Sequence, residues 1–121
     1  MVPALQTFDA VLDGTLDCGH GYPSYWAGKS PAMNLIMSTP FGMNAQEKTA
    51  WLFYGGGLEL VDKVYRDFGA KFLPLGNCGI QPLGWFKNEI KSLQDLQGLK
   101  FRVSGLCGEV LRECGVAVVG L

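Results

Sequence analysis

Helix-like and strand-like patterns alternate along this chain of 121 residues, and that order limits the fold more than any other feature. Apolar residues recur at helical spacing in four stretches, residues 3–12, 45–54, 58–68 and 106–114. Short apolar or alternating runs typical of strands lie between them, at residues 16–21, 32–38, 71–76, 99–105 and 116–121. The alternation predicts an α/β protein.

Two kinds of signal predict where the helices begin and end. Asn44 is followed three residues later by Glu47, which is the spacing of a capping box, so the helix over 45–54 should begin directly after Asn44. Gly14, Gly69 and Gly115 follow the other helical stretches, where glycine commonly ends a helix.

Composition and charge exclude several classes of function. Ten basic and eleven acidic residues give a net charge of −1, and no basic patch stands out, so we expect no nucleic-acid partner. No apolar run approaches the ~20 residues that a membrane-spanning helix needs. The first residues lack a basic start followed by an apolar run, which predicts no signal peptide and, from the sequence alone, a cytoplasmic or unassigned location.

Cysteine and histidine give little support for catalysis or for a zinc site. The four cysteines have no zinc spacing, and Cys107 and Cys114 would lie about 10 Å apart along one helix, so we expect free thiols. The single histidine, His20, lies between glycines. An enzyme with Arg102 as a carboxylate anchor and His20 or Glu109 as its acid–base group is an alternative, but no spacing supports it, and we predict that the chain is not an enzyme.

Arg102 is the most informative charged residue. It lies in a predicted strand and faces away from the apolar Phe101 and Val103. A strand-borne guanidinium can present two parallel N–H donors to a carboxylate. The alternative is a surface arginine that pairs with an acid on a helix, and the spacing leaves both interpretations open.

The uncharged stretch GNCGIQPLGWF, residues 76–86, is the second candidate for a site. Asn77 and Gln81 carry amides that both donate and accept hydrogen bonds, and an amide oxygen such as that of Gln81 can also coordinate a cation. Trp85 can close an apolar wall, and the glycines allow a close approach of the backbone to a ligand. The alternative is a turn with a structural tryptophan.

The sequence resembles a known family. GNCGIQPLGWF followed by IKSLQDLQGLKFRVSGLCGEVLRECGV is similar to the central segment of the substrate-binding receptors of tripartite ATP-independent periplasmic (TRAP) transporters. The branch that binds 2-oxo acids and related carboxylates is the most similar. The segments FDAVLDGTLDCGHGYPSYWAGKSPAMNL, STPFGMNAQEKTAWLFYGGG and LELVDKVYRDFGAKFLPLGN follow the order of that family, so the resemblance covers essentially the whole chain.

The resemblance implies a partial periplasmic-binding-protein-like (type II) α/β fold with parts of two lobes. Residues 1–74 would form part of lobe I, and residues 75–121 the crossover strand and part of lobe II. Residues 76–86 would then lie on the wall of the cleft, as a rigid segment.

The resemblance also implies roles for individual residues. Arg102 matches the arginine that clamps the carboxylate of the ligand. Gln81 matches an amide that contacts the ligand and, in the 2-oxo acid branch, a bound cation, so a sodium ion is expected with the ligand and no other cofactor. Tyr25 matches an aromatic position at the cleft, and Trp85 would form part of the apolar wall of the cleft. Asn77 is the remaining expected ligand-binding residue.

The chain also departs from the family, whose receptors are longer and begin with a signal peptide. We therefore expect a truncated receptor domain that lacks half of the pocket, leaves apolar surface exposed near residues 72–75 and 116–121, and associates with itself. The family acts in the periplasm with membrane permease subunits, which the fragment is not expected to engage. The alternative function is a self-associating structural fragment that binds no small molecule.

Overall fold

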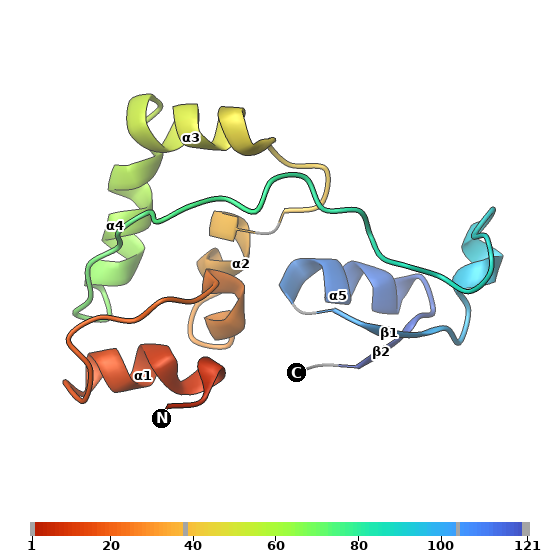
Figure 1. Cartoon of the computed structure of the whole chain (residues 1–121), viewed down its shortest axis with the longest axis horizontal. Helices are drawn as coiled ribbons and strands as arrows, with labels where there is room; N and C mark the ends of the chain where they lie inside the picture. Colours follow the sequence, from red (N-terminus) through yellow and green to blue (C-terminus); the bar gives the residue numbers. More distant parts are fainter. Residues whose placement is uncertain (1, 38, 104, 120–121) are drawn as a thin grey trace.

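The computed structural model describes residues 2–37, 39–103 and 105–119. Figure 1 shows two groups of elements joined by a long extended segment. We call residues 2–70 the N-terminal group, residues 93–119 the C-terminal group and residues 71–92 the crossing segment.

The N-terminal group is helical and has its own apolar core. Its elements are η1 (Ala4–Gln6), α1 (Thr7–Leu12), η2 (Pro23–Trp26), α2 (Ala32–Met37), α3 (Ala45–Tyr54) and α4 (Gly57–Arg66). The ring of Phe8 stacks on Trp26 with centroids 4.9 Å apart and meets Tyr65 edge-on at 5.5 Å. Met33, Ile36 and Val61 complete these buried side chains, which we call the N-terminal cluster.

The predicted helix boundaries are largely confirmed. Asn44 Oδ1 accepts hydrogen bonds from the backbone N–H groups of Gln46 and Glu47 at 2.9 and 3.0 Å, and Glu47 Oε2 accepts from Asn44 N–H at 2.9 Å. This capping box starts α3 at Ala45, as predicted. Gly69 follows α4, and Gly115 follows the last helix, α5 (Gly105–Glu113), with positive φ angles of 80° and 83°.

Three of the predicted strands are not strands, and two of these lie in the N-terminal group. Residues 32–37 form helix α2, and the predicted residue 38 lies outside the described residues. The prediction was wrong because a short apolar run is equally compatible with a buried strand and a buried helix. In α2, Met33 and Ile36 are three residues apart and both enter the N-terminal cluster, while Leu35 is 61% exposed. Residues 16–21, also predicted as a strand, form an irregular connection.

The C-terminal group is a small β–α–β unit preceded by a helical turn. Its elements are η3 (Leu93–Leu96), β1 (Lys100–Arg102), α5 (Gly105–Glu113) and β2 (Ala117–Val119). The two strands are parallel, with Phe101 opposite Val118. Lys100 and Arg102 are exposed and Phe101 is half-buried, which confirms the predicted alternation. Buried Leu96, Leu111 and Val116 form what we call the C-terminal cluster.

The crossing segment contains no helix or strand, although all of its residues are described. The strand predicted over 71–76 was wrong: this part is extended, but no neighbouring strand pairs with it in the described chain. Figure 1 shows the segment leaving the end of α4 and passing α2 to reach the far end of the C-terminal group. Phe72 packs on Tyr65 at one end (5.1 Å between ring centroids), and Phe86 stacks on Phe101 at the other (5.4 Å).

All four cysteines are free thiols, as predicted. Within residues 2–37, 39–103 and 105–119, none of the helices has the length and apolar character that crossing a membrane requires.

Candidate ligand site between the two groups

The carboxyl ends of the two strands face the N-terminal group. Figure 1 shows that α5 begins at the end of the C-terminal group nearest to α2, which is also where β1 ends. Helix α5 contacts both α2 and η2. In open α/β sheets, ligands bind beyond the carboxyl ends of the strands. The boundary between the two groups is therefore the candidate ligand site.

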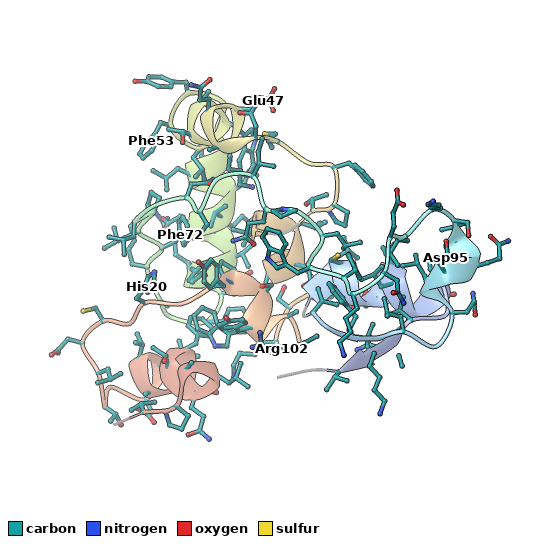
Figure 2. All side chains as sticks on the ribbon, turned by 45° about the vertical axis from the view of Figure 1, so that its right-hand side comes forward. His20, Glu47, Phe53, Phe72, Asp95 and Arg102 are labelled. Atoms are coloured by element: carbon teal, nitrogen blue, oxygen red, sulfur yellow. The ribbon has the colours of Figure 1, made fainter. Side chains whose placement is uncertain are left out.

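Arg102 is the last residue of β1 and is exposed. Figure 2 shows it on the side of the C-terminal group that faces the N-terminal group. Among the described residues, ion pairs join other side chains, and no carboxylate pairs with Arg102. The alternative of a surface arginine held by a helix acid is therefore not found in the described part of the chain, and the guanidinium donors face solvent.

Residues 76–86 are irregular and mostly exposed, with a local turn that begins at Asn77, and they do not form a packed wall. Asn77 Oδ1 accepts a hydrogen bond from Gly79 N–H at 2.8 Å, and Gly79 has a φ of +75° that favours glycine. The oxygen of Asn77 is thus engaged in the turn, and its NH₂ group is the part left for a ligand. Gln81 is exposed, and Trp85 is 95% exposed.

Tyr25 lies on the N-terminal side of the same boundary. It is half-buried in η2, the element that contacts α5. Its ring meets the ring of Tyr22 edge-on with centroids 5.7 Å apart. Tyr22 Oη in turn shares a hydrogen bond with Cys78 Sγ at 2.7 Å, which connects this region to residues 76–86. This hydrogen bond raises the pKa of Tyr22 above its ordinary value.

Tyr25 was predicted from the family resemblance, and Tyr22 was not predicted. The two partners of the Tyr22–Cys78 contact are 56 residues apart, and neither lies in a pattern that indicates the other. The structure thus links Tyr25 to residues 77–81 through Tyr22, and brings η2 against the helix that follows Arg102.

The described residues do not by themselves form a cation site. Gln81 offers one side-chain oxygen, whereas a hard cation such as Ca²⁺ takes six to eight oxygen ligands. No group of three or more His, Cys, Asp or Glu side chains in the described ranges is arranged to hold a metal ion. Gln81 can therefore be one ligand at most of a site completed by other groups.

The acid–base residues of the enzyme alternative gain no support. His20 is exposed, and its ring centroid lies 6.4 Å from that of Tyr22, in a tilted aromatic contact. Glu109 is exposed on α5.

Comparison with known proteins identifies the family. Residues 1–120 match the bacterial extracellular solute-binding proteins of family 7. The chain belongs to this family. It is the family of TRAP solute-binding proteins, which are transport receptors and not enzymes. The predicted family and the prediction that the chain is not an enzyme are therefore both confirmed.

Individual relatives agree on the fold. The chain is 51% identical over 118 residues to a monocarboxylate 2-oxoacid-binding periplasmic protein of Nostoc, matching 98% of this chain and 32% of the relative. It superposes on a TRAP periplasmic solute-binding protein from Pseudoalteromonas atlantica, solved with sodium and pyruvate, with a TM-score of 0.91 and 42% identity, covering 97% of this chain and 36% of the other. A homologue from Colwellia psychrerythraea, solved with calcium and pyruvate, gives 0.92 and 45% over the same shares.

The chain thus spans about a third of the length of these relatives. Its fold is a partial periplasmic-binding-protein-like (type II) fold, as the resemblance implied.

Proposed function

We propose that this chain forms part of the binding site of a TRAP-type solute receptor for a small 2-oxo monocarboxylate such as pyruvate. The observation that carries the proposal is Arg102, which is exposed at the carboxyl end of β1 and has no ion-pair partner among the described residues. Support comes from two relatives that are 42% and 45% identical and were solved with pyruvate.

Each proposed residue has a role that follows from its chemistry. Arg102 donates two parallel hydrogen bonds to the ligand carboxylate. Gln81 donates its amide to the 2-oxo oxygen and offers its own oxygen as one ligand of a cation, which sodium and calcium in the two relatives support. Asn77 donates its NH₂ group, while Tyr25 and Trp85 cover the apolar part of the ligand.

The proposal includes an arrangement and a compartment. Residues 1–74 belong to lobe I, and residues 75–121 to the crossover and part of lobe II, so the ligand lies between Tyr25 on one side and Arg102 on the other. The Nostoc relative is a periplasmic protein, which supports a periplasmic location. The whole receptor of which such a chain forms part would pass the ligand to the membrane permease subunits of a TRAP transporter.

A fluorescence titration tests the role of Arg102. Pyruvate and longer 2-oxo acids are added to the wild type with and without sodium or calcium, and Trp85→Phe identifies Trp85 as the reporter. Arg102→Ala should raise the Kd about 30-fold or more, because truncating one partner of a desolvated charge pair costs about 2–5 kcal/mol. Arg102→Lys should recover only part of the affinity, since it lacks the planar fork.

Arg112→Ala is the matched control, because Arg112 is also exposed but lies on α5, away from the end of β1. It should bind as the wild type does. Equal affinity of wild type and Arg102→Ala would contradict the carboxylate clamp, and a flat response in the wild type would contradict binding by this chain.

A second candidate function is self-association, and exposed apolar side chains on the crossing segment favour it. Leu73, Leu75, Ile80 and Trp85 are 76–95% exposed. Such a concentration of exposed apolar surface commonly marks an interface. In this alternative, a second copy covers the crossing segment, and the chain binds no small molecule.

Sedimentation over a range of concentrations separates the two functions. Self-association predicts a dimer that Ile80→Ser weakens and Phe41→Ser does not, since Phe41 is fully exposed outside the crossing segment. A monomer at every concentration would contradict this alternative. A saturable change in the fluorescence of that monomer on adding pyruvate would support the receptor function.

A further inference from the structure

The turn at residues 77–81 has few contacts to hold it in place. Of residues 73–83, Pro74 is half-buried and all the others are exposed. The hydrogen bond from Gly79 N–H to Asn77 Oδ1 is internal to the turn. Among the described residues, the Tyr22–Cys78 hydrogen bond is the one hydrogen bond that joins residues 73–83 to another segment.

Tyr22, in contrast, has a firmly held backbone. It directly precedes Pro23, the buried first residue of η2. The backbone of Gly21 lies against Trp26, where an added Cβ would come within 2.6 Å of the indole Cη2. Trp26 is 6% exposed and donates its Nε1–H to the carbonyl oxygen of Leu5 at 3.2 Å. The N-terminal cluster therefore fixes the backbone at Tyr22. Cys78 is exposed and has no such packing.

One side chain thus contacts both parts of the proposed site. The ring of Tyr22 meets Tyr25, and its hydroxyl group meets Cys78 between Asn77 and Gln81. A turn that is already held in place loses less conformational freedom when a ligand binds, and that saving appears as affinity.

We propose that Tyr22 is a positioning residue that holds residues 77–81 against η2 through Cys78, so that affinity for the 2-oxo acid depends on the Tyr22 hydroxyl group. The inference rests on the proposed function, because it assigns the held turn to ligand binding. The expected effect is that of one neutral hydrogen bond, about two- to tenfold in Kd.

The experiment uses the complete 121-residue chain with pyruvate, in buffers containing sodium or calcium. Calorimetry measures the Kd of the wild type, Tyr22→Phe, Cys78→Ala and the double variant. Cys78→Ser keeps a hydrogen-bonding group at the same place and should rescue affinity. Tyr54→Phe is the matched control, since Tyr54 is 91% exposed at the end of α3.

Two readouts that need no ligand accompany the calorimetry. Nuclear Overhauser contacts between the Tyr22 ring protons and the Cys78 β protons report whether the two side chains meet. Thermal unfolding reports stability, and Tyr22→Phe should lower it by no more than the loss of one hydrogen bond, because the ring and its contact with Tyr25 remain. A loss of affinity with no larger loss of stability separates positioning from a general structural role.

The expected result is a contact in the wild type, a two- to tenfold rise in Kd for each single variant, and no further rise in the double variant. Equal Kd values for wild type and Tyr22→Phe would overturn the positioning role while the proposed function stands. Additive losses in the double variant, or no Overhauser contact, would overturn the connection through Cys78. Absence of any pyruvate binding in the wild type would overturn the proposed function, and the positioning role with it.

Discussion

Asp62 is the most heavily engaged charged residue of the described chain. Its side chain is 6% exposed, and Lys71 Nζ lies 2.7 Å from Oδ2. Arg66 pairs with the same oxygen one helical turn along α4, and Phe72 N–H donates to Oδ1 at 3.4 Å. These contacts fix the first residues of the crossing segment to α4.

The pKa of Asp62 lies below its ordinary value of 3.8, chiefly because of the hydrogen bond from Lys71. A depressed carboxyl pKa in the folded state means stabilisation that is complete above about pH 4 and lost as pH falls through the lower, folded value. Urea unfolding from pH 7 to pH 2 should therefore show a steeper acid loss for wild type than for Asp62→Asn. The control is Asp67→Asn, which changes an exposed carboxylate at the end of the same helix. Parallel curves for wild type and Asp62→Asn would contradict the argument.

At the residue scale, local pattern predicted some site candidates and could not predict others. The alternation around Arg102 placed it on the exposed face of a strand, and the structure agrees. Tyr25 and the cation role of Gln81 came from the family resemblance, and their roles stay predictions. Tyr22 was not predicted, because its partner Cys78 comes near it only through the path of the crossing segment. The spacing of residues within a short stretch cannot predict such a contact.

At the scale of elements, α3 depends on its cap more than on its packing. None of its residues is fully buried, although half-buried Trp51 and Leu52 pack against the N-terminal cluster. Lys48 lies over the ring of Trp51, 4.5 Å from its centroid, which covers part of that face. The capping box at Asn44 therefore supplies a large share of what holds the first turn.

Asn44→Ala should lower the free energy of unfolding by about 1 kcal/mol, within the usual range of ~0.5–2 for a lost cap. Asn44→Ser, which keeps an acceptor oxygen, should lose much less. Urea denaturation followed by circular dichroism measures both. If the two variants lose equal stability, the side-chain hydrogen bonds are not the cause.

Helix α2 shows why element type was harder to predict than element position. The limits of the apolar run at 32–38 were recognisable. A run as short as the six residues of α2 fits the repeat of a helix and the repeat of a strand equally well when nearly all of its residues are apolar. What selects the helix is tertiary: Met33 and Ile36 meet the N-terminal cluster from one face, while Asn34 is also buried. The part at 71–76 is extended, as a strand would be, but it is not a strand because it has no paired neighbour. The pattern within a segment cannot predict whether such a neighbour exists.

At the scale of the molecule, the two clusters are separate in sequence and unequal in size. The N-terminal cluster contains three large aromatic side chains, Phe8, Trp26 and Tyr65, whereas the C-terminal cluster rests on Leu96, Leu111 and Val116. The α/β class was predictable because β1, α5 and β2 of the C-terminal group follow one another directly in the sequence. How the groups meet was not, because that depends on long-range contacts of α5 with α2 and η2.

Met33→Ala should cost about 2–5 kcal/mol, because Met33 is fully buried and its removal leaves a cavity in the N-terminal cluster. Leu35→Ala on the same helix should cost well under 1 kcal/mol, as its side chain is 61% exposed. Chemical denaturation followed by Trp fluorescence measures both. Similar losses for the two variants would mean that α2 does not present Met33 to the core.

The sparse packing of residues 73–83 has a consequence for how such receptors diverge. No fully buried side chain lies in this stretch, so substitutions there leave both clusters intact and escape the usual selection against destabilising change. Under the proposed function, such substitutions would change the side chains beside the ligand and leave the core as it is. Position 78 differs from its neighbours under the positioning role proposed above, because a substitution there would release residues 77–81 from Tyr22.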